Sequence, residues 1–504
     1  MGALYRLPLF LLLTGLASAS MVLPAVVALA EEEFHDARAF FYSALVGMVL
    51  TVLIAIAQAT RRHNRSASRQ LLALMGAFVL LPAVLAVPFH EALRTTTFLN
   101  AFFEMVSSLT TTGATLFEPS RLSSAEHLWR AQVGWLGGLL MWVAAAAILA
   151  PLTLGGFEIT ARGEPGQSVD ALAGRRDMSD PAQRLGASSR ILVPVYAGLT
   201  LALWIMLLLA GDPPLVALSH AMSTMATSGI SPVGGPINAP SGLAGEMIIF
   251  CFLFFALSRL TFSGDTGASY RPGLREDPEF RMGLSIAALV PAVLFLRHWI
   301  AAFDVGGEQN LELALRALWG GVFTALSFLS TTGFVSADWA EAQGWSGLST
   351  PGLILMGLAI VGGGVATTAG GVKLLRIYAL YLAGKRELER LVHPSSIGRS
   401  GVMARRIRRQ GAFIAWVFFM MFAMSIAVFS LIFGLFGIDF ENAMVLTIAA
   451  LTNCGPLIPA AAELPVDLAG LSAGAKLTVC AAMVLGRLEL LAIVVLLTPD
   501  IWRD

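Results

Sequence analysis

Cysteine and charge are both scarce in this sequence of 504 residues. It contains 3 Cys, which excludes a small scaffold held together by disulfides. The 33 basic residues are balanced by 33 acidic ones, which argues against a nucleic-acid binder. Charged residues make up 13% of the chain, against roughly 25% in an ordinary soluble domain. With a mean hydropathy of +0.75 the chain cannot cover itself with a polar surface, so we interpret it as a polytopic membrane protein.

Motifs of the common enzyme classes are also missing. The pair His90-Glu91 lacks the second His of a zinc-protease helix, and neither a P-loop nor a Gly-x-Ser-x-Gly elbow occurs. We therefore expect no enzyme activity and no organic cofactor in this chain. Any dependence on a nucleotide would have to come from a partner.

Apolar stretches long enough to cross a bilayer, about 20 residues each, occur ten times. They lie near 5–30, 38–59, 70–89, 129–153, 188–210, 242–262, 281–302, 350–382, 410–437 and 471–498. Four shorter apolar stretches lie between them, near 97–111, 214–227, 313–331 and 440–453. Short hydrophobic segments between full spans are candidates for re-entrant helices. The first stretch resembles a signal peptide after Arg6, but its apolar run continues to Ala30, so we expect a retained helix.

The basic residues predict the orientation in the membrane. They gather in alternate loops, at 61–69, 162–190, 259–281 and 373–409, whereas the opposite loops are comparatively acidic. We therefore expect both termini in the cytoplasm, consistent with an even number of spans. The three Cys fall in apolar segments, which fits a reduced state.

A repeat runs through the chain from residue 70 onward. Each unit reads span, short apolar helix, small polar strip and span, with one Gly directly after each short helix. The strips are Thr110-Thr111-Thr112-Gly113-Ala114, Ala226-Thr227-Ser228-Gly229-Ile230, Ser330-Thr331-Thr332-Gly333-Phe334 and Thr452-Asn453-Cys454-Gly455-Pro456. We predict an all-α fold in which four repeats form a single-chain pseudo-tetramer. The expected divisions are two extra helices in 1–69 and repeats in 70–160, 161–275, 276–400 and 401–504.

The chemistry of the strips suits a dehydrated monovalent cation. Backbone carbonyls can replace a hydration shell if four strips converge on one axis. Glycine permits the backbone angles that this requires. No strip contains a carboxylate, whereas hard divalent ions favour carboxylate-rich sites. A single Thr-Thr-Gly would indicate only helix packing, but four copies at equivalent positions favour an ion pathway.

At these residues the sequence resembles the Trk/Ktr/HKT superfamily of potassium transporters, and within it the membrane subunits of bacterial Trk systems. The resemblance covers nearly the whole chain. Besides the strips, it rests on the segments 103–109, Trp129-Arg130, 135–138, Ser219-His220-Ala221, 366–373 and Gly486-Arg487-Leu488-Glu489. The two extra N-terminal helices favour Trk-type over the shorter Ktr-type subunits.

The resemblance implies a potassium selectivity filter, a homodimer and a cytosolic nucleotide-binding regulatory subunit of TrkA type. The implied filter residues are Thr111, Thr112, Gly113, Thr227, Ser228, Gly229, Thr331, Thr332, Gly333, Asn453, Cys454 and Gly455. Three positions depart from the family's usual pattern: Ser228 replaces Gly, Cys454 stands where an aliphatic residue is common, and Ala366 replaces Gly. The first two bear on discrimination between potassium and sodium.

Within the span near 350–382, the ten residues 362–371 contain five Gly, which argue against a continuous helix because each costs about 1 kcal/mol relative to Ala. We predict an intramembrane loop that can block the pore; the alternative is a packing kink. The candidate gate residues are Gly362, Gly363, Gly364, Gly370, Gly371, Lys373 and Arg487.

Arg487 lies in the last span, where a charge needs a partner. Because neighbours two apart do not face each other on a helix, we expect its partner in the loop or the pore rather than at Glu489. The resemblance implies that this Arg lies below the filter and helps the loop to obstruct permeation. The alternative is a structural salt bridge with Glu489 or another carboxylate. Lys373 is read either as part of the gate or as a basic flank.

Other polar residues in the short helices have two readings. Glu104, Asp439 and Glu441 either complement a helix dipole or concentrate cations in a vestibule, and we favour the dipole. His220 is read as a hydrogen-bonded packing residue rather than a metal ligand.

Potassium uptake through a channel-like pore in the bacterial inner membrane is therefore the expected function. The alternative is a sodium- or proton-coupled symporter with the same fold, because broken helices also mark carrier sites.

Overall fold

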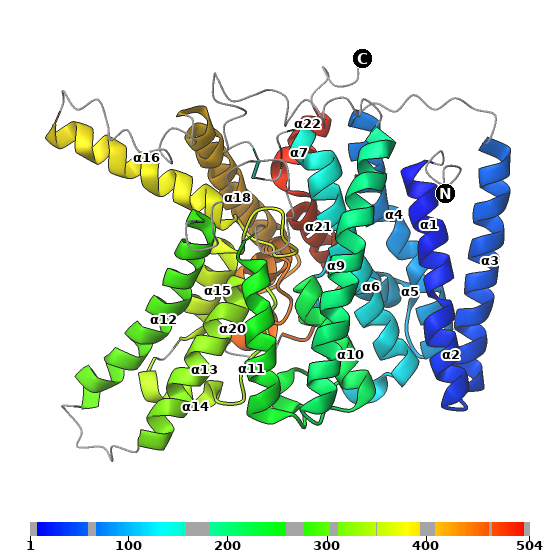
Figure 1. Cartoon of the computed structure of the whole chain (residues 1–504), viewed down its shortest axis with the longest axis horizontal. Helices are drawn as coiled ribbons and strands as arrows, with labels where there is room; N and C mark the ends of the chain where they lie inside the picture. Colours follow the sequence, from blue (N-terminus) through cyan, green and yellow to red (C-terminus); the bar gives the residue numbers. More distant parts are fainter. Residues whose placement is uncertain are drawn as a thin grey trace.

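The computed structural model describes residues 8–58, 67–152, 154, 156–157, 181–258, 277–302, 311–348, 350–393, 409–462 and 466–497. Within these residues every regular element is a helix. Eight helices there are long and apolar enough to cross a membrane. They cover Leu9–Ala30, Phe34–Gln58, Gln70–Leu93, Ser124–Leu149, Gln183–Leu209, Pro278–Arg297, Glu312–Leu329 and Gly411–Leu435. The chain is thus a multi-pass membrane protein (Figure 1).

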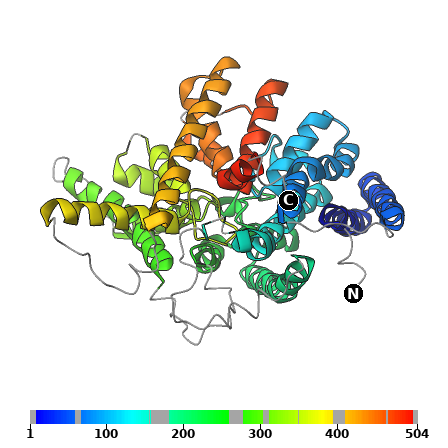
Figure 2. The ribbon, with the colours of Figure 1, turned by 90° about the horizontal axis from the view of Figure 1, so that it is seen from above.

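The first two spans lie outside the repeats, at one edge of the molecule (Figure 2). The first consists of α1 (Leu9–Ser20) and α2 (Val22–Ala30), and the second is α3 (Phe34–Gln58), which packs against both. The buried ring of Phe40 in α3 lies 5.8 Å from the ring of Trp129 and joins this pair to the first repeat.

Four units of long helix, short helix and second helix follow, as predicted. The first contains α4 (Ala67–Leu93), α5 (Phe98–Leu109) and α6 (Ser124–Ala144), the second α9 (Pro181–Leu209), α10 (Pro214–Ala226) and α11 (Gly242–Leu253), the third α12 (Pro278–Ala302), α13 (Leu311–Leu329) and α15 (Gly352–Val361), and the fourth α18 (Arg409–Leu435), α19 (Phe440–Leu451) and α21 (Ala473–Leu488). Smaller elements are η2 (Pro119–Arg121), η3 (Ala145–Leu149), α7 (Ala150–Leu152), η4 (Pro236–Asn238), η5 (Phe254–Ala256), α14 (Trp339–Ser346), α20 (Leu457–Ala461) and α22 (Leu490–Leu497), and α16 (Leu374–Val392) follows the third unit.

Three of the four short helices begin at the same register. Their N-caps Thr97, Pro213 and Asp439 each lie sixteen residues before the strip Gly (97 to 113, 213 to 229, 439 to 455). Thr97 and Asp439 accept hydrogen bonds from the backbone N–H three residues on, which satisfies a free donor of the first turn. The third short helix, α13, begins earlier and is therefore long enough to count as a span, although it occupies the short-helix position.

Three of the ten predicted spans do not form a single helix long enough to cross a membrane within the described residues. α11 ends at Leu253 and tightens into η5, whose Ala256 carbonyl accepts a hydrogen bond from Gly364. The span near 350–382 breaks at Gly362, at the predicted run of glycines. The last span breaks at Glu489, whose positive φ of 63° is incompatible with a helix.

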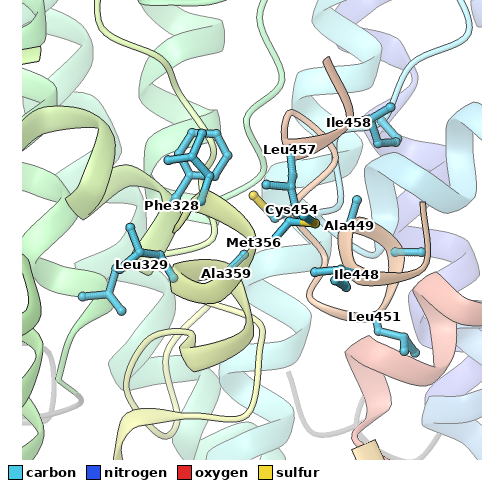
Figure 3. Packing of buried hydrophobic residues seen from close by; sticks show 14 of the residues in the cluster. Phe328, Leu329, Met356, Ala359, Ile448, Ala449, Leu451, Cys454, Leu457 and Ile458 are labelled. Atoms are coloured by element: carbon cyan, nitrogen blue, oxygen red, sulfur yellow. The ribbon is translucent and has the colours of Figure 1, made fainter. Parts of the chain in front are cut away.

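An apolar core joins the third and fourth units. Phe328 and Leu329 from α13, Met356 and Ala359 from α15, and Ile448 and Leu451 from α19 lie together around Cys454 and Leu457 (Figure 3). All eight belong to one buried cluster. This packing fixes the ends of α13 and α19, and so positions the strips that follow them.

Candidate functional site

The four strips share one backbone conformation. In each strip the residue two positions before the Gly is left-handed, with φ between 51° and 58°. These residues are Thr111, Thr227, Thr331 and Asn453. In three strips the Gly itself also has positive φ, at Gly113, Gly229 and Gly333. Four different sequences thus make the same turn at the end of their short helices.

The turn is held by hydrogen bonds to the preceding helix. The N–H just before the strip Gly donates to the carbonyl five residues earlier, at 2.8–3.0 Å in all four repeats. The pairs are Thr112 to Ser107, Ser228 to Ser223, Thr332 to Ser327 and Cys454 to Ala449. These bonds hold each turn against the end of its short helix, and between strips the Gly455 N–H donates to the Thr112 carbonyl at 2.6 Å.

The strips meet each other in a closed ring. A Cβ on Gly113 would lie 1.8 Å from the carbonyl oxygen of Ser228, and one on Gly229 would lie 2.3 Å from that of Thr332. A Cβ on Gly333 would lie 3.0 Å from Cys454 Sγ, and one on Gly455 would lie 2.1 Å from the backbone N of Ala114. Strip one therefore contacts strip two, two contacts three, three contacts four, and four contacts one. Only Gly allows these approaches.

Side chains of the strips hydrogen-bond among themselves and are fully buried. Thr110 pairs with Thr112 at 2.8 Å and Ser330 with Thr332 at 3.0 Å. Asn453 Nδ2 donates to Thr112 Oγ1 at 3.0 Å and to the Met483 carbonyl at 2.9 Å. These bonds fix the backbone and link strip four to strip one.

The Gly-rich loop, residues 362–373, lies directly against the strips. It is not helical, and Gly362, Ala366, Gly371 and Lys373 all have positive φ. Gly370 N donates to Thr331 Oγ1 at 2.7 Å, and a Cβ on Gly370 would lie 1.9 Å from the Thr452 carbonyl oxygen. Thr368 Oγ1 donates to the Met225 carbonyl at 3.1 Å. The loop thus contacts the bases of strips two, three and four.

Arg487 reaches this loop, as the sequence predicts. Its Nη1 donates to the carbonyl of Thr368 at 2.6 Å, while its Nε and Nη2 are buried and have no hydrogen-bond partner among the residues that the structure describes. Glu489 is instead paired with Arg376 of α16 at 2.6 Å. The alternative of an Arg487–Glu489 bridge is therefore wrong, since Arg487 is bonded to the loop and Glu489 to Arg376.

Lys373 is buried and its Nζ donates to the Ala369 carbonyl within the loop. The reading of Lys373 as a simple basic cytoplasmic flank does not account for this burial, whereas its role in a gate stays a prediction. Arg376, counted in the sequence among the basic residues of a loop, is fully buried and lies 3.7 Å from the ring centroid of Phe418. Its place in the amphipathic start of α16 was the only signal for this.

The polar residues of the short helices take structural positions. Glu104 is buried and forms a salt bridge with Arg130 at 2.6 Å, so neither a dipole nor a vestibule role describes it. His220 hydrogen-bonds Ser231 Oγ at 2.7 Å, as a packing residue would. Asp439 caps α19, and hydrogen bonds from the backbone and side-chain amides of Asn442 hold the pKa of that carboxyl below its usual range.

Sequence reasoning missed Glu246 in α11. Its buried carboxylate accepts hydrogen bonds from Ser336 Oγ at 2.7 Å, the Ala337 N–H at 2.6 Å and Trp319 Nε1 at 2.9 Å. The signal was a lone acid in the apolar run from Gly242 to Leu253, because a buried carboxylate needs partners.

Comparisons with known proteins agree with this architecture. The family model of TrkH, described as a cation transport protein, matches residues 274–503. The Trk system potassium uptake protein TrkH of Salmonella typhimurium is 30% identical over 497 residues, which is 98% of each chain. TrkG of Escherichia coli K12 is 30% identical and covers 81% of this chain and 80% of its own.

A solved structure covers the whole chain. The crystal structure of the potassium transporter TrkH from Vibrio parahaemolyticus matches with a TM-score of 0.80 and 28% identity, over 100% of both chains. The sequence resemblance, the repeat architecture and these matches agree, and the chain belongs to the TrkH family of cation transport proteins.

Proposed function

We propose that this chain takes up potassium through a channel-like pore whose selectivity filter is formed by the four strips. Its relatives are named as potassium uptake proteins, none of them as an enzyme. The observation that carries the proposal is the closed ring of four strips that share a left-handed residue two positions before the Gly. A ring of backbone carbonyls is the arrangement by which filters replace the hydration shell of potassium.

The proposed filter consists of three residues from each strip, ending at the Gly. They are Thr111, Thr112 and Gly113, Thr227, Ser228 and Gly229, Thr331, Thr332 and Gly333, and Asn453, Cys454 and Gly455. These residues offer carbonyl and hydroxyl oxygens but no carboxylate, which favours a weakly hydrated monovalent ion over a divalent one. An inside-negative potential supplies about 2.3 kcal/mol per charge for every 100 mV, which drives uptake without a nucleotide.

The proposed gate is the Gly-rich loop together with Arg487. The loop holds Gly362, Gly363, Gly364, Gly370, Gly371 and Lys373. It hydrogen-bonds the base of strip three at Thr331, and Arg487 holds it from the other side at Thr368. A permanent positive charge at this depth also opposes a cation that leaves the filter. In this proposal the loop closes the pore while it contacts the strips, and opening requires it to leave them.

The proposal extends to the assembly. We assign the repeats to 70–160, 161–275, 276–400 and 401–504, with 1–69 as two additional helices. The outer end of α1 and that of α22 lie toward the same face (Figure 1), which supports termini on one side of the bacterial inner membrane, the cytoplasmic one. A homodimer with a cytosolic, nucleotide-binding subunit of TrkA type completes the proposal, on the strength of the family alone.

Rubidium uptake into liposomes that contain the purified chain tests the filter. We expect wild-type flux to be inhibited far more by potassium than by sodium. Gly113→Ala should abolish it, because the new Cβ would collide with the Ser228 carbonyl. Gly76→Ala in α4 is the matched control, since a Cβ there meets nothing within 4 Å.

Flux that survives in Gly113→Ala would overturn the filter. Wild-type flux that appears only with a sodium or proton gradient would favour the symporter. If the isolated chain shows no flux, the regulatory partner is added so that the loop can open. Gly113→Ala and Gly76→Ala then test the filter in that complex.

A further inference from the structure

One register of the short helices carries a buried side chain behind the filter. Nine residues before the strip Gly stand Glu104, His220, Thr324 and Leu446 (104 to 113, 220 to 229, 324 to 333, 446 to 455). All four are fully buried. Three of them are polar, and the cost of burying a polar group requires partners for each.

The three polar residues hold the chain segment that follows their own strip. Glu104 Oε2 accepts a hydrogen bond from Leu116 N at 3.1 Å, and Thr324 Oγ1 accepts one from Ser336 N at 3.3 Å. His220 Nε2 pairs with Ser231 Oγ at 2.7 Å. Each bond ties a residue two or three positions beyond the Gly back to the short helix, so that the outer end of the strip is fixed at both sides.

In repeat four the side chain at this register is apolar, so the segment after the strip is not held by a side-chain hydrogen bond from it. Leu446 belongs to the apolar cluster that also contains Leu457 and Ile458, the residues just after strip four. There the chain turns directly into α20, and Ile458 N donates to the Gly455 carbonyl at 2.9 Å. The outer mouth of the ring is therefore held by side-chain hydrogen bonds in three repeats, and by apolar packing and a backbone hydrogen bond in the fourth.

The outer end of strip three is held by more hydrogen bonds than the others, because Glu246 adds to the bond made by Thr324. It lies on α11 of the second repeat, yet it binds Ser336 and Ala337 of the third. The third donor, Trp319 Nε1, comes from α13 itself. One carboxylate thereby joins the second repeat, the short helix of the third and the segment beyond Gly333. In strip one, Arg130 anchors Glu104 from α6 in a comparable way.

We propose that Glu246 is a positioning residue that sets the discrimination of the filter between potassium and sodium, by holding the outer end of strip three. Glu104 and His220 hold the outer ends of strips one and two in the same way. The inference rests on the proposed filter. A carbonyl cage prefers the larger ion only while its oxygens stay apart, and a site whose supporting contacts are loosened loses that preference before it loses its fold.

The variant Glu246→Gln tests this at nearly constant volume. It replaces one acceptor oxygen by an NH₂ group, which cannot accept a hydrogen bond from any of the three donors. We expect rubidium flux to persist and its inhibition by sodium to increase several-fold. Glu341→Gln, an exposed carboxylate of α14 in the third repeat, is the matched control and should leave the ratio of rubidium flux without sodium to that with sodium unchanged.

Ser336→Ala is a second test, because it removes one donor and leaves the carboxylate with the other two. A smaller shift in the same direction is expected, and this variant answers the question if Glu246→Gln does not fold. If the residue were merely structural, its variant would have a lower melting temperature and a lower rubidium flux. The fraction of that flux that sodium inhibits would stay the same. An unchanged ratio in folded, conducting variants would overturn the proposal.

The two proposals fail in different ways. If Gly113→Ala conducts normally or wild type does not discriminate, the filter itself is wrong. If wild type is selective and Gly113→Ala is inactive, the filter stands. If the Glu246 and Ser336 variants then show the same inhibition by sodium as wild type, only the proposed role of Glu246 is wrong.

Discussion

At the residue scale, the strips depend on strain in residues that are not glycine. Thr111, Thr227 and Thr331 are β-branched, and a left-handed backbone costs such a residue about 1–3 kcal/mol. The surrounding structure must supply that energy, here through hydrogen bonds from the strip to the helix end. In strip four, Gly455 lacks a positive φ, and its small size is needed instead for the close approach to Ala114.

The sequence therefore predicted the importance of the four Gly but not which residues carry the strain. Threonine gives no sign of a left-handed backbone, because the conformation is imposed by the neighbouring strips. The partner of Arg487 was predictable for a different reason. Helical periodicity alone excludes Glu489, and the run of glycines marks the nearest free carbonyls.

Arg487→Ala should speed rubidium uptake by the wild-type filter. The substitution removes the hydrogen bond to the Thr368 carbonyl and the positive charge beneath the strips, so the loop is held less firmly. Initial uptake rates at matched protein density measure the effect. Arg390→Ala, on the exposed part of α16, is the control for loss of one positive charge and should not change the rate. A rate at or below that of wild type would contradict the proposed gate.

At the element scale, the last span is two helices joined at Glu489. This residue ends α21 with a positive φ and sends its carboxylate to Arg376 at the start of α16. Hydropathy predicts one continuous span over 471–498, because α21 and α22 are both apolar. The break could not be read from local sequence, since Glu489 leaves the helix to reach a residue 113 positions away.

Glu489→Ala should destabilise the protein strongly. The variant removes one partner of a buried ion pair, a change that costs about 3–5 kcal/mol. Arg376 has no exposed surface, and the Glu489 side chain is 9% exposed. Glu387→Ala breaks the exposed pair of the same helix with Arg390, where a surface pair contributes about 0–1 kcal/mol.

Thermal unfolding in detergent compares the two variants directly. The midpoint should fall far more for Glu489→Ala than for Glu387→Ala. Equal midpoints would mean that the Arg376–Glu489 pair does not hold the break between α21 and α22.

At the scale of the whole molecule, the repeat was visible in the sequence because each unit preserves the order of long helix, short helix and Gly strip. Three short helices even keep the same distance from cap to Gly. The contacts between units were not visible. Glu246 with Ser336, Asn453 with Thr112 and Thr368 with Met225 all join different repeats, and nothing in one repeat specifies its partner in the next.

The closed ring predicts that each chain contains a complete pore. Strip four contacts strip one of the same chain, so no position of the ring is left for a second copy. A symmetric dimer then carries two pores side by side, and an interface between copies contributes no filter residue. A pore shared between chains would instead expose an open edge of the ring in each copy.

Complexes of one wild-type and one Gly113→Ala chain distinguish these arrangements. Two different tags and two purification steps isolate them, and rubidium uptake is measured per wild-type chain. Separate pores predict that each wild-type chain keeps its full rate, because the defect in the partner lies in another ring. A shared pore predicts that one defective chain inactivates the whole complex, since a single displaced carbonyl disturbs all four strips. Full activity per wild-type chain would mean that a single chain conducts on its own. The proposed dimer would then serve regulation or stability.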